Sequence, residues 1–352
     1  MVSLIDDDYE ILVIAKENGI ISLDINGQTY YEENSGALYT EKCHAKIRVP
    51  MAVLDKEKKY TVRYRKTIER KSYYSKLEDP VEKEYSFRPV EKTDGINLYH
   101  ISDVHYRFEL AKNTATYFGT ELDALLVNGD IGEVESVENY KEVAKFVADI
   151  TKGELPVVFV RGNHDTRGHL AELYADYFPT NGKKTYFSFN LGPFRGIAFD
   201  CGEDKADTHI AYGGTNDFAG FRRRETEFLR ALERTEKPTF AIGHIPPSYL
   251  GSAPDFQIED ETYRTWLSEL GRIGTQFMIC GHIHKAFVLQ KNDPQSARPH
   301  NFPIIVGAEA MNGLMWGSAL IIKNGKMQVL FTDNEHKVMK SHVIDLNTGN
   351  IE

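Results

Sequence analysis

Cysteine is scarce in this sequence, with three residues among 352, widely spaced and without a CxxC pair. An odd number of isolated cysteines argues against a disulfide framework and against a zinc–thiolate site, and it favours a reducing compartment. We therefore expect Cys43, Cys201 and Cys280 to be free thiols that are buried or partly buried.

Long apolar runs are also missing, since no stretch approaches the roughly 20 residues that a helix needs to cross a bilayer. The N-terminus carries Asp6, Asp7 and Asp8, where a secretory signal would be basic and then apolar. We expect a cytoplasmic protein, or an extracytoplasmic one from which a signal has been removed, and no membrane partner.

Positive charge is in deficit, because the formal net charge is −10. A protein that grips polyanions usually presents a basic face, and the whole-chain balance points the other way. The basic clusters at 56–59 and 222–224 are short and lie among acidic residues, so we interpret them as solvated faces. Nucleic acid is not excluded as a substrate, but no global feature supports it, and nothing in the pattern indicates an oligomeric state.

What the chain does have is the balance of a globular protein, with 41% hydrophobic and 27% charged residues. A length of 352 residues predicts two domains or one large one. We see neither internal repeats nor a low-complexity segment, so we place a boundary from changes in the hydrophobic pattern.

The first 93 residues alternate strand-like runs with turns, and we find no helix there. This density of short strands predicts a small all-β sandwich, similar to an immunoglobulin or fibronectin III domain, at 1–93, followed by a linker at 89–95. We expect this domain to be complete in itself. The candidate strands are Glu10–Ala15, Gly19–Ile25, Thr29–Glu32, Cys43–Val49, Tyr60–Arg65, Tyr73–Lys76 and Glu84–Arg88.

From Ile96 onwards apolar strands alternate with amphipathic helices, a pattern that predicts parallel strands with helices packed outside them, in a domain at 94–352. The expected strands are Ile96–Ile101, Ala124–Val127, Val157–Val160, Phe240–Ile242, Phe277–Cys280, Ile304–Val306, Ser318–Lys323, Met327–Phe331 and Val338–Ile344. The expected helices are Phe108–Thr120, Ser136–Thr151, His169–Phe178, Phe221–Glu233 and Asp260–Leu270.

Polar motifs follow five of these strands, each at the point where the strand ends. They are Asp103-Val104-His105, Gly129-Asp130, Gly162-Asn163-His164-Asp165, Gly243-His244 and Gly281-His282-Ile283-His284. Taken singly, a Gly-Asp pair is typical of turns and a loop histidine of an ordinary hydrogen-bonded side chain. Ligands of open α/β sheets bind beyond the carboxyl ends of the strands, so the ordered combination indicates one site.

The side chains in these motifs are imidazoles, carboxylates and an amide, without a thiolate. Such donors suit manganese, iron, zinc or cobalt, and there are enough of them for two divalent ions. Two ions that share a carboxylate such as Asp130 would lower the pKa of a bound water and generate hydroxide near neutral pH. The pattern therefore predicts a binuclear hydrolytic centre.

The five motifs, in this order, resemble those of the calcineurin-like metallophosphoesterases. The resemblance covers about residues 97–352 and implies a four-layer α/β/β/α sandwich with a binuclear centre in its cleft. It implies that one metal is held by Asp103, His105 and His284, and the other by Asn163, His244 and His282, with Asp130 bridging the two. His164 is implied as the group that protonates the leaving alkoxide or stabilises the transition state, with Asp165 beside it.

A β-sandwich before the catalytic domain is similar to the layout of purple acid phosphatases, but the motifs depart from that branch. It has a tyrosine shortly after the Gly-Asp pair, where this chain has Ile131-Gly132-Glu133, and it lacks the histidine of the first motif. We therefore expect no iron–tyrosinate chromophore.

Outside the motifs, Arg167 could hold a substrate phosphate with its planar guanidinium, or be a surface arginine that starts the next helix. The segment 202–220 contains His209 and Tyr212, which we expect to contact substrate unless the segment is simply a flexible surface loop. We interpret His100 as a packed histidine near the site. Four other histidines carry no motif and are expected to be ordinary: His169, His300, His336 and His342.

We therefore expect a metal-dependent hydrolase of a small phosphate ester, with a phosphatase favoured over a phosphodiesterase acting on a small nucleotide or lipid headgroup. A second hypothesis is a catalytically silent scaffold on the same fold. Scaffolds of this kind lose ligands or the catalytic histidine, whereas every ligand position and His164 are filled here.

Overall fold

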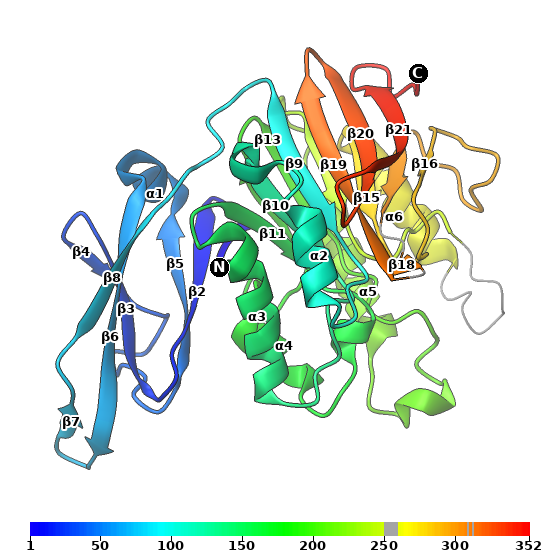
Figure 1. The fold of residues 1–352 in the computed structure, drawn as a ribbon. Coiled ribbons are helices and arrows are strands. Elements are labelled where there is room, and N and C mark those ends of the chain that lie inside the picture. The colour runs from blue at the N-terminus through cyan, green and yellow to red at the C-terminus, as the bar shows by residue number, and fades with distance from the viewer. Residues whose placement is uncertain (250–259, 308–309, 312) are drawn as a thin grey trace.

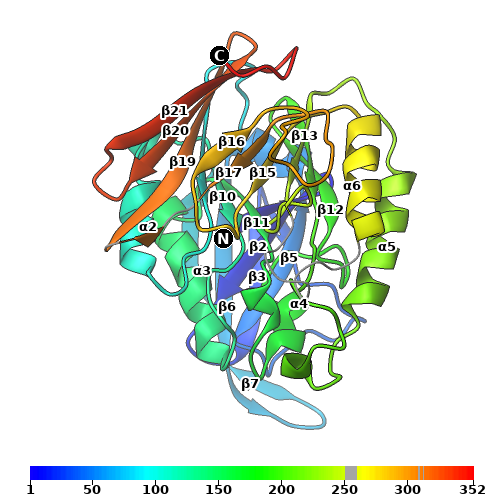
Figure 2. The same cartoon turned by 90° about the vertical axis from the view of Figure 1, so that its right-hand side faces the viewer.

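The computed structural model describes residues 1–249, 260–307, 310–311 and 313–352. Two β-sheets lie at its centre with helices on their outer sides, and a smaller sheet extends from one end (Figure 1). A view from the side shows the helices of the second sheet as a separate outer layer (Figure 2). Within the described residues, none of the helices is long and apolar enough to cross a membrane.

The first central sheet has the order β21 (Val338–Asp345), β20 (Lys326–Asp333), β19 (Leu314–Lys323), β9 (Ile96–Ile101), β10 (Ala124–Asn128), β11 (Pro156–Val160), β1 (Val2–Ile5), β2 (Asp8–Ile14) and β5 (His44–Pro50), with β18 (Ala310–Met311) paired to β19. The second has the order β12 (Phe187–Leu191), β13 (Phe194–Ala198), β14 (Thr239–Ile242), β15 (Thr275–Cys280), β17 (Ile304–Val306) and β16 (Phe287–Leu289).

Each central strand is buried on both faces, because one face of its sheet packs on the other sheet and the opposite face packs on helices. Alternate residues along a strand therefore belong to different apolar clusters. In β10, Leu126 packs between the two sheets, while Leu125 and Val127 pack under the helices. In β15, Phe277 lies between the sheets and Met278 faces the other helices. The helices on the first sheet are α2 (Phe108–Ala115), α3 (Val137–Thr151) and α4 (Tyr174–Tyr177), and those on the second are α5 (Phe218–Ala231) and α6 (Asp260–Arg272). The predicted four-layer α/β/β/α class is confirmed.

The N-terminal region differs from the predicted self-contained sandwich. Its first strand, β1, pairs in parallel with β11 of the central sheet, with Val2 opposite Pro156 and Ser3 opposite Val157. The strands β2 and β5 then extend the same sheet. One apolar cluster runs from Leu23 in the small sheet to Leu126 at the centre of the molecule. The pairing argues against an independent first domain, although the boundary at residue 93 itself stays a prediction.

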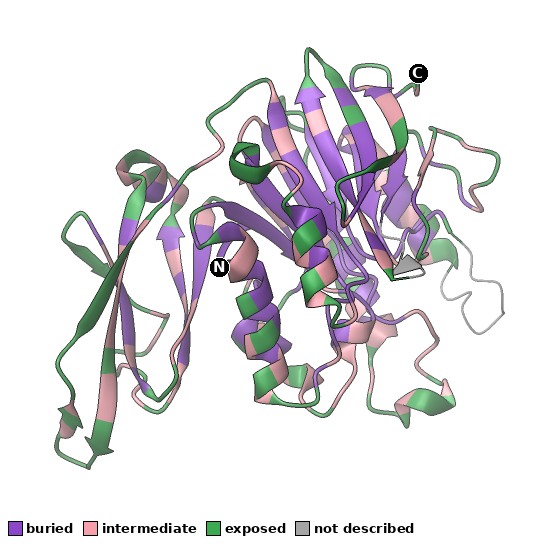
Figure 3. Ribbon diagram, viewed as in Figure 1, coloured by how far each residue is buried: buried purple, intermediate pink, exposed green. Residues whose placement is uncertain are grey.

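The small sheet contains β4 (Gln28–Tyr30), β3 (Gly19–Ile25), β6 (Lys59–Arg70), β7 (Ser75–Leu77) and β8 (Val81–Ser86). Its outer strand β8 is largely exposed, whereas β10 and β11 of the first central sheet are buried along their whole length (Figure 3). The expectation of no helix in this region was wrong, because α1 (Met51–Glu57) connects β5 to β6. Seven residues are too few for a helical period to show in the sequence.

Other details differ from the sequence expectations as well. The helix expected at His169–Phe178 is broken into a 3₁₀ turn, Ala171–Leu173, and the short α4. The hairpin β12–β13 was not expected, although it forms one side of the second sheet. The three cysteines are free as expected, with Cys201 and Cys280 buried and Cys43 partly buried.

Removing residues 1–93 is expected to give an insoluble or metal-free product, since it strips β1 from β11 and leaves a buried strand edge open to other chains. Soluble yield, circular dichroism and metal analysis would measure this. Deleting only the exposed tip between β6 and β7 should leave a soluble, metal-binding protein. A folded, metal-binding fragment 94–352 would instead establish two independent domains.

Candidate metal centre

The polar motifs meet at one edge of the two central sheets. The strands β9, β10 and β11 are parallel in the first sheet, and β14 and β15 are parallel in the second. Their carboxyl ends therefore lie on the same side, and each is followed directly by one motif. Because the two sheets pack face to face, residues that are far apart in the sequence come together there.

One group of donors contains Asp103, His105 and His284, whose ligand atoms all lie within 4.8 Å of one another. The Oδ1 atom of Asp103 lies 3.5 Å from Nε2 of His284. The rings of His105 and His284 are parallel, with centroids 5.3 Å apart. This is the first set that the sequence predicts.

A second group contains Asp130, His244 and His282, again within 4.8 Å of one another. The Nε2 atom of His244 lies 3.1 Å from Oδ2 of Asp130. Asn163 joins this group, because its Oδ1 atom lies 3.0 Å from Nδ1 of His282. All members of the second predicted set are therefore close together.

The carboxylate of Asp130 lies between the two groups. Its Oδ2 atom is 3.1 Å from His244 on one side and 4.0 Å from Nε2 of His105 on the other. A third candidate group, formed by His105, Asp130 and His164, overlaps both. The position suits a carboxylate that bridges two ions.

Hydrogen bonds orient the donors and leave some of their atoms free. Oδ2 of Asp103 accepts from Ser102 Oγ at 2.5 Å and from the His282 amide at 3.0 Å. Its Oδ1 atom is buried and makes no hydrogen bond within the described residues. His244 donates from Nδ1 to the Asn128 carbonyl at 2.7 Å, which turns Nε2 towards Asp130. These free, aligned atoms fit divalent metal ions.

The backbone is strained at the donor residues. A positive φ is uncommon for residues other than glycine, and such strain tends to accumulate at functional sites. Positive φ angles occur at five of the predicted ligands, namely Asp103 (53°), His105 (44°), Asp130 (54°), His282 (70°) and His284 (53°). The fold therefore holds these side chains in a geometry that their backbones would not adopt alone.

Glycine permits the close approach of neighbouring loops. A Cβ atom on Gly129 would lie 2.6 Å from the Cα of Gly162 and 2.7 Å from the His244 ring. Gly129 also has a φ of 75°, which disfavours other residues. Gly129 and Gly162 thus permit the close packing of the two loops that carry Asp130 and Asn163.

The buried carboxylates and imidazoles of the site shift one another's pKa values. Burial alone would raise the pKa of Asp130, but the neighbouring His244 holds it below its usual range. Burial alone would lower the pKa of His244, yet the carboxylates of Asp130 and Asp103 raise it to about 10. Burial lowers the pKa of His105 to about 4 and of His282 to about 3, which keeps these imidazoles neutral and able to coordinate.

His164 and Asp165 have different surroundings. Nδ1 of His164 lies 2.9 Å from Oε1 of Glu133, and Nε2 faces Asp130 at 3.9 Å. Asp165 is buried and accepts from the amides of Gly162 at 2.8 Å and Asp130 at 3.0 Å. Its carboxylate holds two loops together, so this geometry favours a positioning role over a catalytic one.

The structure brings Arg167 to the site, but with a partner that the sequence did not suggest. Its guanidinium forms a two-point ion pair with the buried Glu203 and also contacts His164. Tyr212 lies against the same Glu203, and burial together with this carboxylate raises the pKa of Tyr212. His209 caps a short turn by accepting from the Ala211 amide at 3.2 Å, a contact within its own loop.

His100 is buried as expected, with Nε2 lying 3.2 Å from the Asn128 side chain. Sequence reasoning missed Glu133 and Glu203. Glu133 follows Asp130 by three positions, a spacing that was a possible signal. Glu203 has no motif around it.

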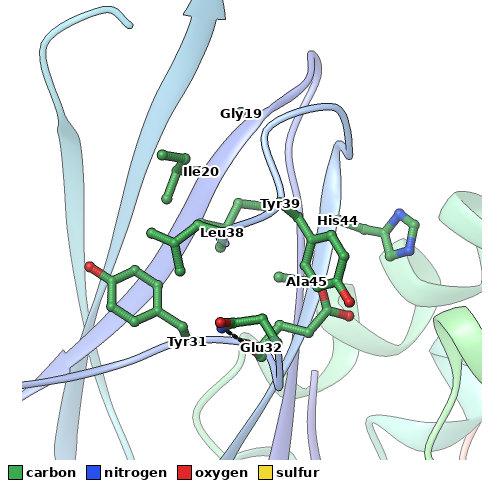
Figure 4. Close-up of a pocket in the computed structure, with 10 residues that line it drawn as sticks. Gly19, Ile20, Tyr31, Glu32, Leu38, Tyr39, His44 and Ala45 are labelled. Atoms are coloured by element: carbon green, nitrogen blue, oxygen red, sulfur yellow. Dashed lines mark hydrogen bonds between the residues drawn. The ribbon is translucent and has the colours of Figure 1, made fainter. Parts of the chain in front are cut away.

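A pocket in the N-terminal region is not a second site of this kind. It is lined by Tyr31, Tyr39 and Glu32 (Figure 4), and its volume is about 10 Å³, barely enough for one water molecule. The carboxylate of Glu32 is already paired with Lys42 at 2.9 Å, and the Lys42 ammonium lies 4.6 Å from the centre of the Tyr39 ring. The Lys42 ammonium thus already occupies the position next to Glu32 and Tyr39 that a bound cation would take.

Comparison with protein families gives a match to the calcineurin-like phosphoesterase model over residues 96–286, more than half of the chain. The chain belongs to this family. It is therefore a hydrolase that acts on phosphoester bonds, and the family implies divalent metal ions.

Two solved structures share the fold over nearly the whole chain. Purple acid phosphatase PPD1 from yellow lupin (Lupinus luteus) seeds is 11% identical with a TM-score of 0.63, covering 96% of this chain and 72% of that one. PhoD is 9% identical with a TM-score of 0.58, covering 99% and 90%. A search of curated protein sequences finds no match.

Proposed function

We propose that this protein hydrolyses small phosphate esters, monoesters foremost, with a hydroxide activated by two divalent metal ions. The observation that carries the proposal is the position of Asp130 between two groups of donor atoms. The free, buried Oδ1 of Asp103 adds support, since an uncompensated buried carboxylate oxygen is costly unless it binds a cation.

Each predicted ligand has a place in this scheme. One ion would be held by Asp103, His105 and His284, and the other by Asn163, His244 and His282, with Asp130 touching both. Manganese, iron, zinc and cobalt all suit these donors. When bound, such ions supply a hydroxide near neutral pH and neutralise charge on the phosphate.

His164 is suited to deliver the proton that the leaving alkoxide needs. Its Nδ1 atom contacts Oε1 of Glu133 at 2.9 Å, and its Nε2 atom faces Oδ2 of Asp130 at 3.9 Å. A carboxylate behind the imidazole fixes its orientation in many acid–base sites. We infer that Glu133 is a positioning residue for His164.

Two alternatives are less well supported. A phosphodiesterase would use the same ligands and differ only in how the second ester group is accommodated. A silent scaffold would not need to hold so many donors in strained conformations, with five predicted ligands at positive φ. The cytoplasmic location and the fibronectin III-like character of the N-terminal region stay predictions.

Chelation is expected to abolish hydrolysis of a chromogenic phosphate ester, because the attacking hydroxide and the charge clamp both depend on the ions. Adding manganese, cobalt, zinc or iron should restore activity, with two ions per chain by elemental analysis. Recovery of activity when metal is returned to the chelator-treated protein serves as the control against irreversible inactivation by the chelator. Full turnover in protein proved free of metal would refute the metal mechanism.

A further inference from the structure

Glu203 is a fully buried carboxylate beside the metal centre, a few residues after β13. Its two oxygens accept from Nε of Arg167 at 2.5 Å and from Nη2 at 2.9 Å, so the pair is bidentate. A second carboxylate, Asp204, lies 3.5 Å from the same Nη2. Two of the three guanidinium nitrogens are therefore committed to this loop.

The remaining nitrogen, Nη1, points towards the site. It lies 3.0 Å from Nε2 and 3.3 Å from Nδ1 of His164. Nη1 is therefore in hydrogen-bond contact with the imidazole of His164, more closely with Nε2 than with Nδ1. Its two N–H groups are the donors of Arg167 that the Glu203 pair does not use, and at least one of them is directed at His164.

We propose that Glu203 is a positioning residue that aims Nη1 of Arg167 at a phosphate oxygen, and that this contact selects phosphate monoesters over diesters. The inference rests on the proposed function. A monoester has three non-bridging oxygens and a diester has two. Two metal ions can each take one oxygen of either substrate, so only the monoester keeps a third for Arg167.

Orientation matters more than charge in this arrangement. Glu203 neutralises Arg167, so the pair attracts a dianion weakly, and the gain comes from the direction of the Nη1–H groups. A lysine has no planar fork and would not be aimed in the same way. Arg167→Lys should therefore behave like a loss of the contact, although it keeps the positive charge.

A purely structural role is the competing explanation. Glu203 also accepts from Thr166 Oγ1 at 3.4 Å, and it could simply fasten the loop after β13 to the His164 loop. In that case its replacement would weaken every ligand of the site to a similar degree. A purely structural role would not weaken the binding of a monoester-like anion more than the binding of a diester-like anion.

Binding of two anions to the metal-loaded, full-length protein separates the explanations. Inorganic phosphate stands for the monoester and dimethyl phosphate for the diester, and calorimetry gives both dissociation constants. Arg167→Lys and Glu203→Gln are each expected to weaken phosphate about tenfold and dimethyl phosphate less than about twofold. A double variant should lose no more than either single one, because the two residues act as one unit.

The exposed pair Arg63–Glu82, with Nε 2.7 Å from Oε1, provides matched controls through Arg63→Lys and Glu82→Gln. Neither should change either constant. Equal weakening of both anions, or no weakening of phosphate, would overturn the proposal. If Glu203→Gln does not fold, Glu203→Asp, which keeps the charge but shortens the side chain, takes its place and should weaken phosphate binding more than dimethyl phosphate binding. An unmodified protein without any esterase activity would refute the proposed function instead, while the binding comparison would still test the Arg167 contact.

Discussion

Replacing Asp130 by alanine is expected to lower turnover by roughly 10³-fold or more, since several kcal/mol of transition-state stabilisation depend on the metal ions. Oδ2 of Asp130 lies against His244 and faces His105, so the change removes a donor from both ion positions. Oδ1 accepts from the His164 amide at 2.8 Å, so the loop that carries the proposed acid also loses an anchor. Metal content and turnover should fall together.

Two comparisons isolate the role of this carboxylate. Asp130→Asn keeps an oxygen for the His164 amide but lacks the charge, so it should retain the fold and still lose metal. Asp123, another buried aspartate, precedes the same strand at its opposite end and pairs with Lys92 at 2.9 Å. Asp123→Asn should therefore cost stability without lowering metal content per folded chain. A fully loaded, active Asp130→Ala protein would remove the bridging assignment.

The central strands were predictable because parallel strands between two layers are apolar on both faces. The run at Ile96–Ile101 shows this directly, since the predicted and observed bounds agree. The strand β1 was missed for a physical reason. Val2–Ile5 is four residues long, and its partner β11 lies more than 150 positions away. A short apolar run gives no information about which sheet it joins.

The convergence of the five motifs was predictable because each follows a strand end, where the sheet topology brings residues together. Side chains that act through a neighbour were not. Glu203 and Arg167 are separated by 36 positions and meet only through the packing of two loops. Asp165 shows the same limit, since nothing in the motifs indicates that its carboxylate accepts from the amides of Gly162 and Asp130.

Changing His164 to alanine is expected to lower turnover by roughly 10²–10⁴-fold on an alkyl phosphate, the usual range for general acid–base catalysis. An alkoxide leaves poorly without a proton, which Nε2 of His164 is placed to donate while Nδ1 contacts Glu133. With a nitrophenyl phosphate the loss should be much smaller, because nitrophenolate leaves without protonation. Metal content should stay near that of the unmodified protein.

The controls for this prediction lie on the same loop and in the partner carboxylate. His169 is exposed and pairs with Glu135 at 3.1 Å, so His169→Ala should leave both substrates unaffected. Glu133→Gln keeps a hydrogen-bond acceptor but removes the carboxylate charge beside Nδ1 of His164, so it should reproduce the leaving-group dependence in weaker form. If His164→Ala slows both substrates equally with full metal content, His164 does not donate the proton. Its place beside Asp130 and Arg167 would then indicate stabilisation of phosphate charge in the transition state.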